Sequence, residues 1–112
     1  MTKVQATIRE SQLQAVVERL LLIGISGLTL SSVHGFGRSG GHEVVFRGSA
    51  YRTQFQPKLL LEWYGSDRKA DAVVRAIVQS GATGKVGDGK IFLMPLDEVV
   101  RIRTGERGED AL

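Results

Sequence analysis

The sequence predicts an α+β fold, a ferredoxin-like βαββαβ sandwich that residues 1–112 build as a single domain. Short segments in which apolar and polar residues alternate are typical of half-buried strands. Two longer segments carry apolar residues at the spacing of amphipathic helices. These segments follow one another as strand–helix–strand twice over, which is the order of the two split βαβ units in such a sandwich.

The first half of the chain supplies a helix between two strands. Residues 3–8 alternate in polarity and form the first predicted strand. Ser11 and Gln14 match the S-x-x-Q capping box, a signal for the start of a helix. Apolar residues at helical spacing continue from there, so we expect a helix over residues 11–22. Two glycines then interrupt the pattern before the second predicted strand, at residues 28–33.

The second half repeats this order. Residues 58–64 are dense in apolar side chains and form the third predicted strand. Ser66 or Asp67 can cap the second helix. Residues 91–94 form the last strand, and residues 99–102 are apolar enough to pack back on the body of the domain. The buried stripe of the second helix is expected to contain Ala70, Val73, Val74, Ile77 and Val78.

Composition limits the classes of function. A net charge of +3 and a pI near 9.6 favour anionic partners, without choosing between nucleotides and nucleic acid. The absence of cysteine excludes disulfides, thiolate metal sites and cysteine nucleophiles. No apolar run approaches the roughly 20 residues that cross a bilayer, and the first residues do not resemble a signal peptide. We therefore expect a cytoplasmic protein that does not insert into a membrane.

Two segments do not fit the sandwich, and both are rich in glycine. Residues 35–56 are too long for an ordinary connection, and residues 81–90 join the second helix to the last strand. Glycines allow backbone N–H groups to approach a ligand and to form an anion-binding nest. Cationic side chains accompany them: Arg38 in the first segment, Lys85 and Lys90 in the second. The alternative is that both segments are simply tight turns.

Neither of the standard phosphate-binding motifs is complete in these segments. Residues 35–40 satisfy G-x-G-x-x-G, but no helix pattern follows to receive a pyrophosphate. Residues 84–90 resemble a Walker A loop, but Ile91 stands where a hydroxyl must hold magnesium. Downstream, Arg101 and Arg103 project to one side if their segment is extended, which suits a phosphate. A solvated edge is the alternative for this arginine pair.

Four blocks of sequence resemble the PII signal-transduction proteins over nearly the whole chain. The blocks are residues 35–38 (GFGR), 46–51 (FRGSAY), 83–92 (TGKVGDGKIF) and 100–106 (VRIRTGE). The resemblance implies a homotrimer that binds ATP or ADP between neighbouring subunits, with Mg²⁺ accompanying ATP. It implies three functional segments: a T-loop at about residues 36–56 that docks on targets, a phosphate loop at 81–90 and a C-terminal loop at 101–112.

The resemblance also implies roles for individual residues. Lys58 would face 2-oxoglutarate in those members that bind it. Arg101 and Arg103 would reach the phosphates from the adjacent subunit, and Thr29 and Tyr64 would lie near the adenine. The phosphates would be wrapped from two sides by Gly35, Gly37, Arg38, Gly87, Asp88, Gly89 and Lys90.

One departure from the family pattern concerns the effector. Most members carry glutamine directly after G-F-G-R, where it helps to hold the magnesium that chelates 2-oxoglutarate, whereas this chain carries Ser39. Serine is shorter and a weaker ligand, so direct coordination is in doubt, although a water can bridge the gap. A divergent regulator that responds to bicarbonate, to another small anion or to nucleotide alone is the alternative.

Other site hypotheses concern modification and metals. Tyr51 matches a tyrosine that is uridylylated in some members, and Ser49 matches a serine that is phosphorylated in others. Either modification would add charge to the loop and disturb docking, but hydroxyl residues are common in loops. His34 and His42 are isolated and predict no metal site by themselves.

Three functions follow, in decreasing order of support. The first is a non-enzymatic sensor that binds a target transporter, enzyme or regulator through the T-loop. The second is a slow ATPase, for which Asp88 and Glu62 are the general bases nearest the loops. The third is an RNA-binding module, which needs exposed aromatic residues on the central strands. Phe92, Trp63 and Tyr64 lack the expected aromatic-basic signature, so we expect no nucleic-acid partner.

Overall fold

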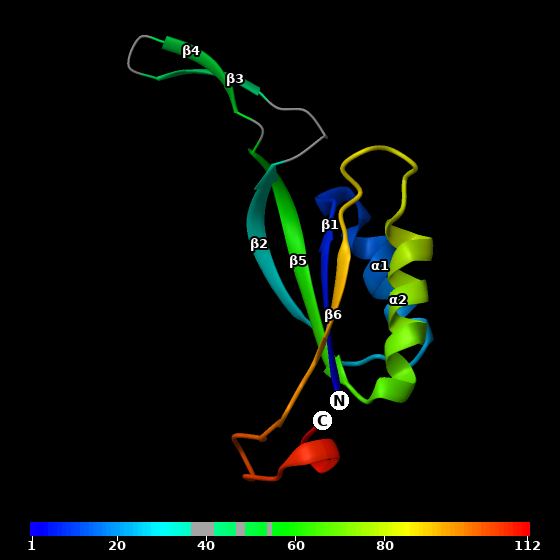
Figure 1. The fold of residues 1–112 in the computed structure, drawn as a ribbon. Helices are drawn as coiled ribbons and strands as arrows, with labels where there is room; N and C mark the ends of the chain where they lie inside the picture. The colour runs from blue at the N-terminus through cyan, green and yellow to red at the C-terminus, as the bar shows by residue number, and fades with distance from the viewer. Residues whose placement is uncertain (37–41, 47–48, 54) are drawn as a thin grey trace.

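The computed structural model describes residues 1–36 and 55–112 in full, together with the backbone of residues 42–46 and 49–53. Four strands form one antiparallel sheet in the order β2-β5-β1-β6, and two helices lie on one side of it (Figure 1). This arrangement confirms the predicted ferredoxin-like sandwich. Its elements are β1 (Thr2–Ile8), α1 (Leu13–Leu22), β2 (Thr29–Phe36), β5 (Phe55–Gly65), α2 (Asp67–Gly81) and β6 (Ile91–Pro95).

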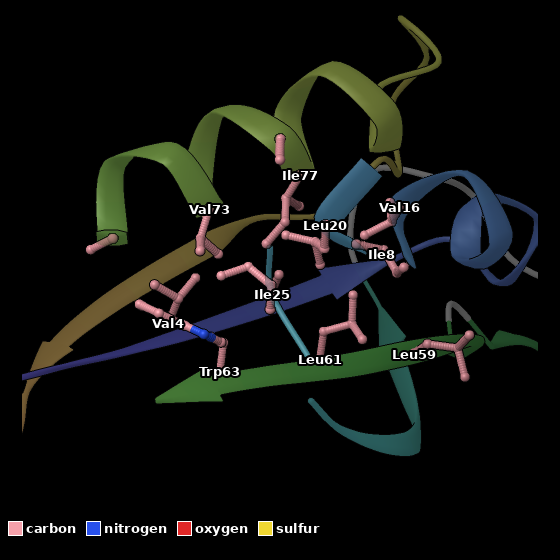
Figure 2. Close-up of a cluster of buried hydrophobic side chains, with 13 residues drawn as sticks. Val4, Ile8, Val16, Leu20, Ile25, Leu59, Leu61, Trp63, Val73 and Ile77 are labelled. Atoms are coloured by element: carbon pink, nitrogen blue, oxygen red, sulfur yellow. The ribbon is translucent and has the colours of Figure 1, made fainter. Parts of the chain in front are cut away.

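The core lies between the sheet and the two helices. Alternate residues of β1 (Val4, Ala6 and Ile8) are buried and stand opposite Trp63, Leu61 and Leu59 of β5. Val16 and Leu20 of α1 and Val73 and Ile77 of α2 close this layer from above, as Figure 2 shows. The predicted helical stripes are therefore correct in their central residues, whereas Val78 is half exposed. Burial of this apolar layer is the main force that holds the domain together.

The opposite face of the sheet has no helix over it (Figure 1). Because side chains alternate along a strand, the residues between the core positions point to this face. Tyr64 and Phe92 are 41% and 50% exposed there, and Lys3 and Glu62 form an ion pair beside them. A broad, partly apolar surface is thus left uncovered in the single chain.

The long segment between β2 and β5 contains a feature that the sequence analysis missed. β2 and β5 extend beyond their predicted ends and pair as far as Phe36 and Phe55. Beyond this point, β3 (His42–Phe46) and β4 (Ser49–Thr53) form a separate two-stranded hairpin that projects away from the sheet (Figure 1). The glycine-rich composition predicts a loop here. The two strands have five residues each, which is too short for their periodicity to indicate a strand.

The predicted capping box at α1 is wrong, and the predicted cap at α2 is correct in position only. Residues Glu10–Gln12 form a 3₁₀ turn before α1, so Ser11 lies inside that turn and donates to the Gln12 side chain. Gln14 likewise donates to Glu18 and does not reach back to the helix start. At α2, Ser66 occupies the N-cap position without a side-chain hydrogen bond. The Asp67 carboxylate instead accepts from Thr2 and pairs with the N-terminal ammonium group.

The segment after β6 does not pack on the body as predicted. Val100 is 46% exposed and Ile102 is fully exposed. The reason is that residues 102–104 form a turn, which the isolated bridge between Val100 and Arg107 closes. A short 3₁₀ helix, Gly108–Ala111, ends the chain.

No helix in the described part of the chain is long and apolar enough to span a bilayer.

Candidate functional site

A pocket of about 730 Å³ lies where the loop between α2 and β6 meets the ends of β1, β2 and β5. It gathers several residues that the sequence analysis selected separately: Gly35 from β2, Lys58 from β5, and Lys90 from the loop. Its full lining is Thr7, Gly35, Phe36, Lys58, Lys85, Val86, Gly87, Asp88, Gly89, Lys90 and Phe92. Gly35 of the first glycine cluster and Gly87 and Gly89 of the second therefore line one pocket.

The loop from Ala82 to Lys90 needs its glycines. Gly84, Gly87 and Gly89 have φ values of 84°, 106° and 98°, a region that residues with a side chain rarely adopt. At Gly89 a Cβ atom would stand 1.6 Å from the carbonyl oxygen of Thr7. The loop therefore lies directly on the end of β1, and the Thr7 N–H donates to the Lys90 carbonyl over 3.0 Å.

Asp88 holds this loop together from inside. Its carboxylate accepts from Arg9 Nε (2.8 Å), from the Thr83 N–H (2.7 Å) and hydroxyl, and from the Gly84 N–H (3.0 Å). The hydrogen bond from Arg9, followed by those from Thr83 and Gly84, holds the pKa of Asp88 far below its usual range. Asp88 is thus an anion at any ordinary pH, and its charge is compensated within the loop.

Lys58 is the buried cation of the pocket. Its side chain is 7% exposed, and its ammonium group donates to the Gly87 carbonyl. Burial, and next the nearby charge of Arg9, lower the pKa of Lys58, while Asp88 opposes this change. A buried ammonium is costly unless it is paired. Because Lys58 donates to a neutral carbonyl, its ammonium group can still pair with an anion that enters the pocket.

The open side of the pocket carries further positive charge. Lys85 and Lys90 are exposed and form no ion pair with any residue that the structure describes. The one carboxylate in the lining, Asp88, is already paired with Arg9. With Lys58 beneath them, these lysines give the pocket a net positive charge suited to a phosphate or a small carboxylate.

A second group of predicted residues lies at the other end of the sheet. Thr29 opens β2 and stands opposite Glu62, six residues along the strand from Gly35. Tyr64 lies nearby on β5, donates to Glu62 and receives the Lys3 ammonium 5.7 Å from its ring centroid. The hydrogen bond between them raises the pKa of Tyr64 and lowers the pKa of Glu62. At about 3.3 Å per residue, roughly 20 Å separates this group from the pocket.

Arg101 and Arg103 also lie away from the pocket, in the segment that follows β6 and is drawn in orange to red at the bottom of Figure 1. Because residues 102–104 form a turn, the prediction that both arginines project from an extended segment is wrong. Arg101 pairs with Glu106 over 2.7 Å and donates to the carbonyl of Leu112. Arg103 is exposed and forms no ion pair with the described residues. Arg101 therefore stabilises the turn, whereas Arg103 lies exposed on it.

Several predicted residues lie in or beside the segment between β2 and β5. Gly37, Arg38 and Ser39 lie outside the described residues. Ser49 and Tyr51 lie on β4, where the backbone alone is described. No group of three His, Asp or Glu side chains suited to a metal occurs in the part of the chain that is described.

The sequence analysis missed one residue of the site altogether. Arg9 follows β1 directly and bonds both Asp88 and the Val86 carbonyl, the latter over 2.8 Å. A cation at the end of a strand is a weak signal by itself. Only the topology, which brings that strand end beneath the loop 79 residues later in the chain, reveals its role.

Comparisons with known proteins agree on one family. The sequence model of "Nitrogen regulatory protein P-II" matches residues 1–106. The chain is 46% identical over 112 residues to the nitrogen regulatory protein P-II of Cereibacter sphaeroides, and 45% identical to that of Azospirillum brasilense; each alignment covers 100% of both chains. The crystal structure of Arabidopsis thaliana PII bound to citrate is similar with a TM-score of 0.81 at 38% identity, covering 99% of this chain and 91% of that one.

Proposed function

This chain belongs to the family of nitrogen regulatory proteins P-II, and from that premise we propose that it is a trimeric, ATP- and ADP-binding signal protein that regulates targets through its T-loop. The observation that carries this proposal is the preshaped cationic pocket beneath the loop of residues 82–90. Its volume falls within the range of about 300–1,000 Å³ that is typical of small-molecule sites.

The pocket suits the polyphosphate of a nucleotide. Gly87 and Gly89 leave their backbone exposed to a ligand, and Lys90 stands beside them with no competing carboxylate. Gly35 borders the same space from β2, and Gly37 and Arg38 follow it in the sequence. Magnesium would enter with ATP and be held chiefly by its phosphate oxygens, as is common for this ion.

The separation of the predicted site residues favours an assembly of several copies. Arg103, Thr29 and Tyr64 lie too far from the pocket to contact a ligand bound there in the same chain. A neighbouring subunit placed against the uncovered face of the sheet would bring these residues to it. A ring of three subunits related by cyclic symmetry would supply every pocket with the same second half. The half-exposed Tyr64 and Phe92 would be covered in such a trimer.

The same pocket offers a place for a small carboxylate effector at Lys58, for which 2-oxoglutarate is the first candidate. The Arabidopsis thaliana relative is bound to citrate, which is in keeping with carboxylate binding by this fold. The usual magnesium ligand is missing, because Ser39 stands in its place. The alternative is therefore that bicarbonate is the effector, or that the protein responds to nucleotide alone.

Signalling would be a shift between states of the T-loop, which leaves the sheet next to the pocket at Gly35 and Phe36. A ligand shifts such an equilibrium only by binding one state more tightly. ATP and ADP would differ in this respect, and a transporter, an enzyme or a regulator would be bound or released. Catalysis is not part of the proposal, since Asp88, the carboxylate nearest the pocket, has no free lone pair to act as a base.

Calorimetric titration with ATP and ADP tests the proposal. Lys90→Ala should weaken both about 10- to 100-fold, because a hydrogen bond to a charged group contributes about 1.5–3 kcal/mol. Arg75→Ala removes an exposed cation of α2 outside the site and serves as control. Binding of ATP by Lys90→Ala as tight as by the parent would show that the site is wrong. Adding 2-oxoglutarate separates a carbon–nitrogen sensor, in which ATP binds more tightly, from a reader of nucleotide alone.

A further inference from the structure

We propose that Asp88 is a positioning residue that forms, with Arg9, a brace holding the phosphate loop in its binding shape, and that its side chain is not a ligand for nucleotide or magnesium. The inference rests on the proposed function in so far as the loop binds phosphate. The brace itself is a feature of the protein without ligand, and it assigns to Arg9 a role in the site.

The Asp88 carboxylate is saturated with hydrogen-bond donors. Oδ1 accepts from Arg9 Nε and from the Thr83 hydroxyl, while Oδ2 accepts from the N–H groups of Thr83 and Gly84. An ionised carboxylate has about four lone-pair positions, and four donors occupy them here. No position remains for a metal ion or for a protonated ligand group.

The brace joins two distant parts of the chain. Arg9 follows β1, and its Nη2 donates to the Val86 carbonyl at 2.8 Å while its Nε donates to Asp88. The loop is therefore tied to the strand end at two points, Val86 and Asp88. On the loop's own side, Asp88 reaches back to Thr83 and Gly84 and closes residues 83–88 into a ring of hydrogen bonds.

A loop that is held in shape before binding also favours affinity. A loop that contains Gly84, Gly87 and Gly89 has many accessible conformations when nothing restrains it. Ordering it upon binding would weaken affinity, whereas a loop ordered beforehand loses little. Neutralising Asp88 with Arg9 also keeps a negative charge from opposing phosphate beside Lys90. The low pKa of Asp88 agrees with this arrangement, because every contact favours the charged form.

Asp88→Asn tests the brace, because it keeps the shape of the side chain and replaces one acceptor oxygen with a donor. In the protein without nucleotide, amide hydrogen exchange at Thr83 and Gly84 should accelerate at least about tenfold, as each loses a charge-assisted hydrogen bond. Asp71→Asn, on the exposed face of α2, is the matched control and should leave these rates unchanged. Unchanged exchange in Asp88→Asn would overturn the proposal, whether or not the protein binds nucleotide.

Calorimetry then separates a brace from a ligand. The brace predicts that Asp88→Asn weakens ATP and ADP by a similar factor, about tenfold, with and without Mg²⁺. A loss confined to Mg²⁺-ATP would show that Asp88 coordinates the metal and would contradict the proposal. Arg9→Gln should reproduce the effect, and the double variant should lose little more than either single one, since the two residues act as one unit. Additive losses would count against the brace.

Discussion

The loop before β6 and the turn after it are both cationic and both contain glycine, yet the molecule holds them in opposite ways. The loop of residues 82–90 is fixed by the body: Arg9 and Lys58 bond it, and Gly89 lies against Thr7. The turn after β6 is fixed by itself, through the Gly105 N–H to the Arg101 carbonyl at 2.7 Å and the pair of Arg101 with Glu106. The loop is therefore part of the domain, whereas the turn is a self-contained unit.

Matched glycine substitutions in the two segments should give the largest difference. Gly89 and Gly105 both have positive φ, at 98° and 74°. A Cβ at Gly89 would overlap the Thr7 carbonyl, whereas a Cβ at Gly105 would meet nothing within 4 Å. Gly89→Ala should therefore lower the free energy of unfolding by about 3 kcal/mol or more, and Gly105→Ala by no more than the roughly 1–2 kcal/mol of left-handed backbone.

Urea denaturation followed by circular dichroism measures both values. The protein concentration must be kept constant, because any assembly of subunits contributes to the apparent stability. Equal losses in the two variants would mean that the turn is as firmly joined to the body as the loop is, and the contrast would disappear.

The contrast also bears on how much the sequence can predict. The strands, the core and the cationic loop follow from local patterns, because alternation, helical spacing and glycine content are readable in short windows. Arg9 was missed because its partner, Asp88, is brought near by topology alone. The capping box at Ser11 was misread because a 3₁₀ turn, which has no strong sequence signal, occupies that position.

The arginine pair shows a different limit. Arg101 and Arg103 remain predicted ligands for an anion, but their spacing was interpreted as an extended segment, whereas residues 102–104 form a turn. The turn there is stabilised in part by Glu106, which meets Arg101 across five positions of the sequence. Which end of the sheet the turn occupies depends on the direction of β6, which emerges only once the sheet is assembled.

Mixing two defective subunits provides the next test, with an effect of about 10- to 100-fold in affinity. Lys90→Ala removes a cation from the loop, and Arg103→Ala removes one from the turn. If each site takes its loop from one subunit and its turn from the next, every mixed trimer contains one intact site, one doubly defective site and one single defect. Mixed trimers, isolated through different tags on the two co-expressed subunits, should therefore regain ATP binding of parental affinity at about a third of their sites.

Homotrimers of either variant, taken through the same purification, are the controls and should show the weak affinity alone. Mixed trimers that bind no better than these homotrimers would place the loop and the turn at separate sites, or within one subunit.

The smallest effect is expected at Glu106, the residue that closes the turn. Its Oε1 accepts from Arg101 at 2.7 Å and from the Thr104 hydroxyl at 2.8 Å. Glu106→Gln keeps an acceptor oxygen but loses the charge, and exposed ion pairs contribute little, about 0–1 kcal/mol. ATP binding should weaken by no more than about fivefold, since Arg103 would be presented less rigidly. Glu18→Gln on α1 is the control. Tighter binding in Glu106→Gln would mean that Glu106 competes with phosphate for Arg101, and the turn would then be a latch that the ligand opens instead of a preformed half-site.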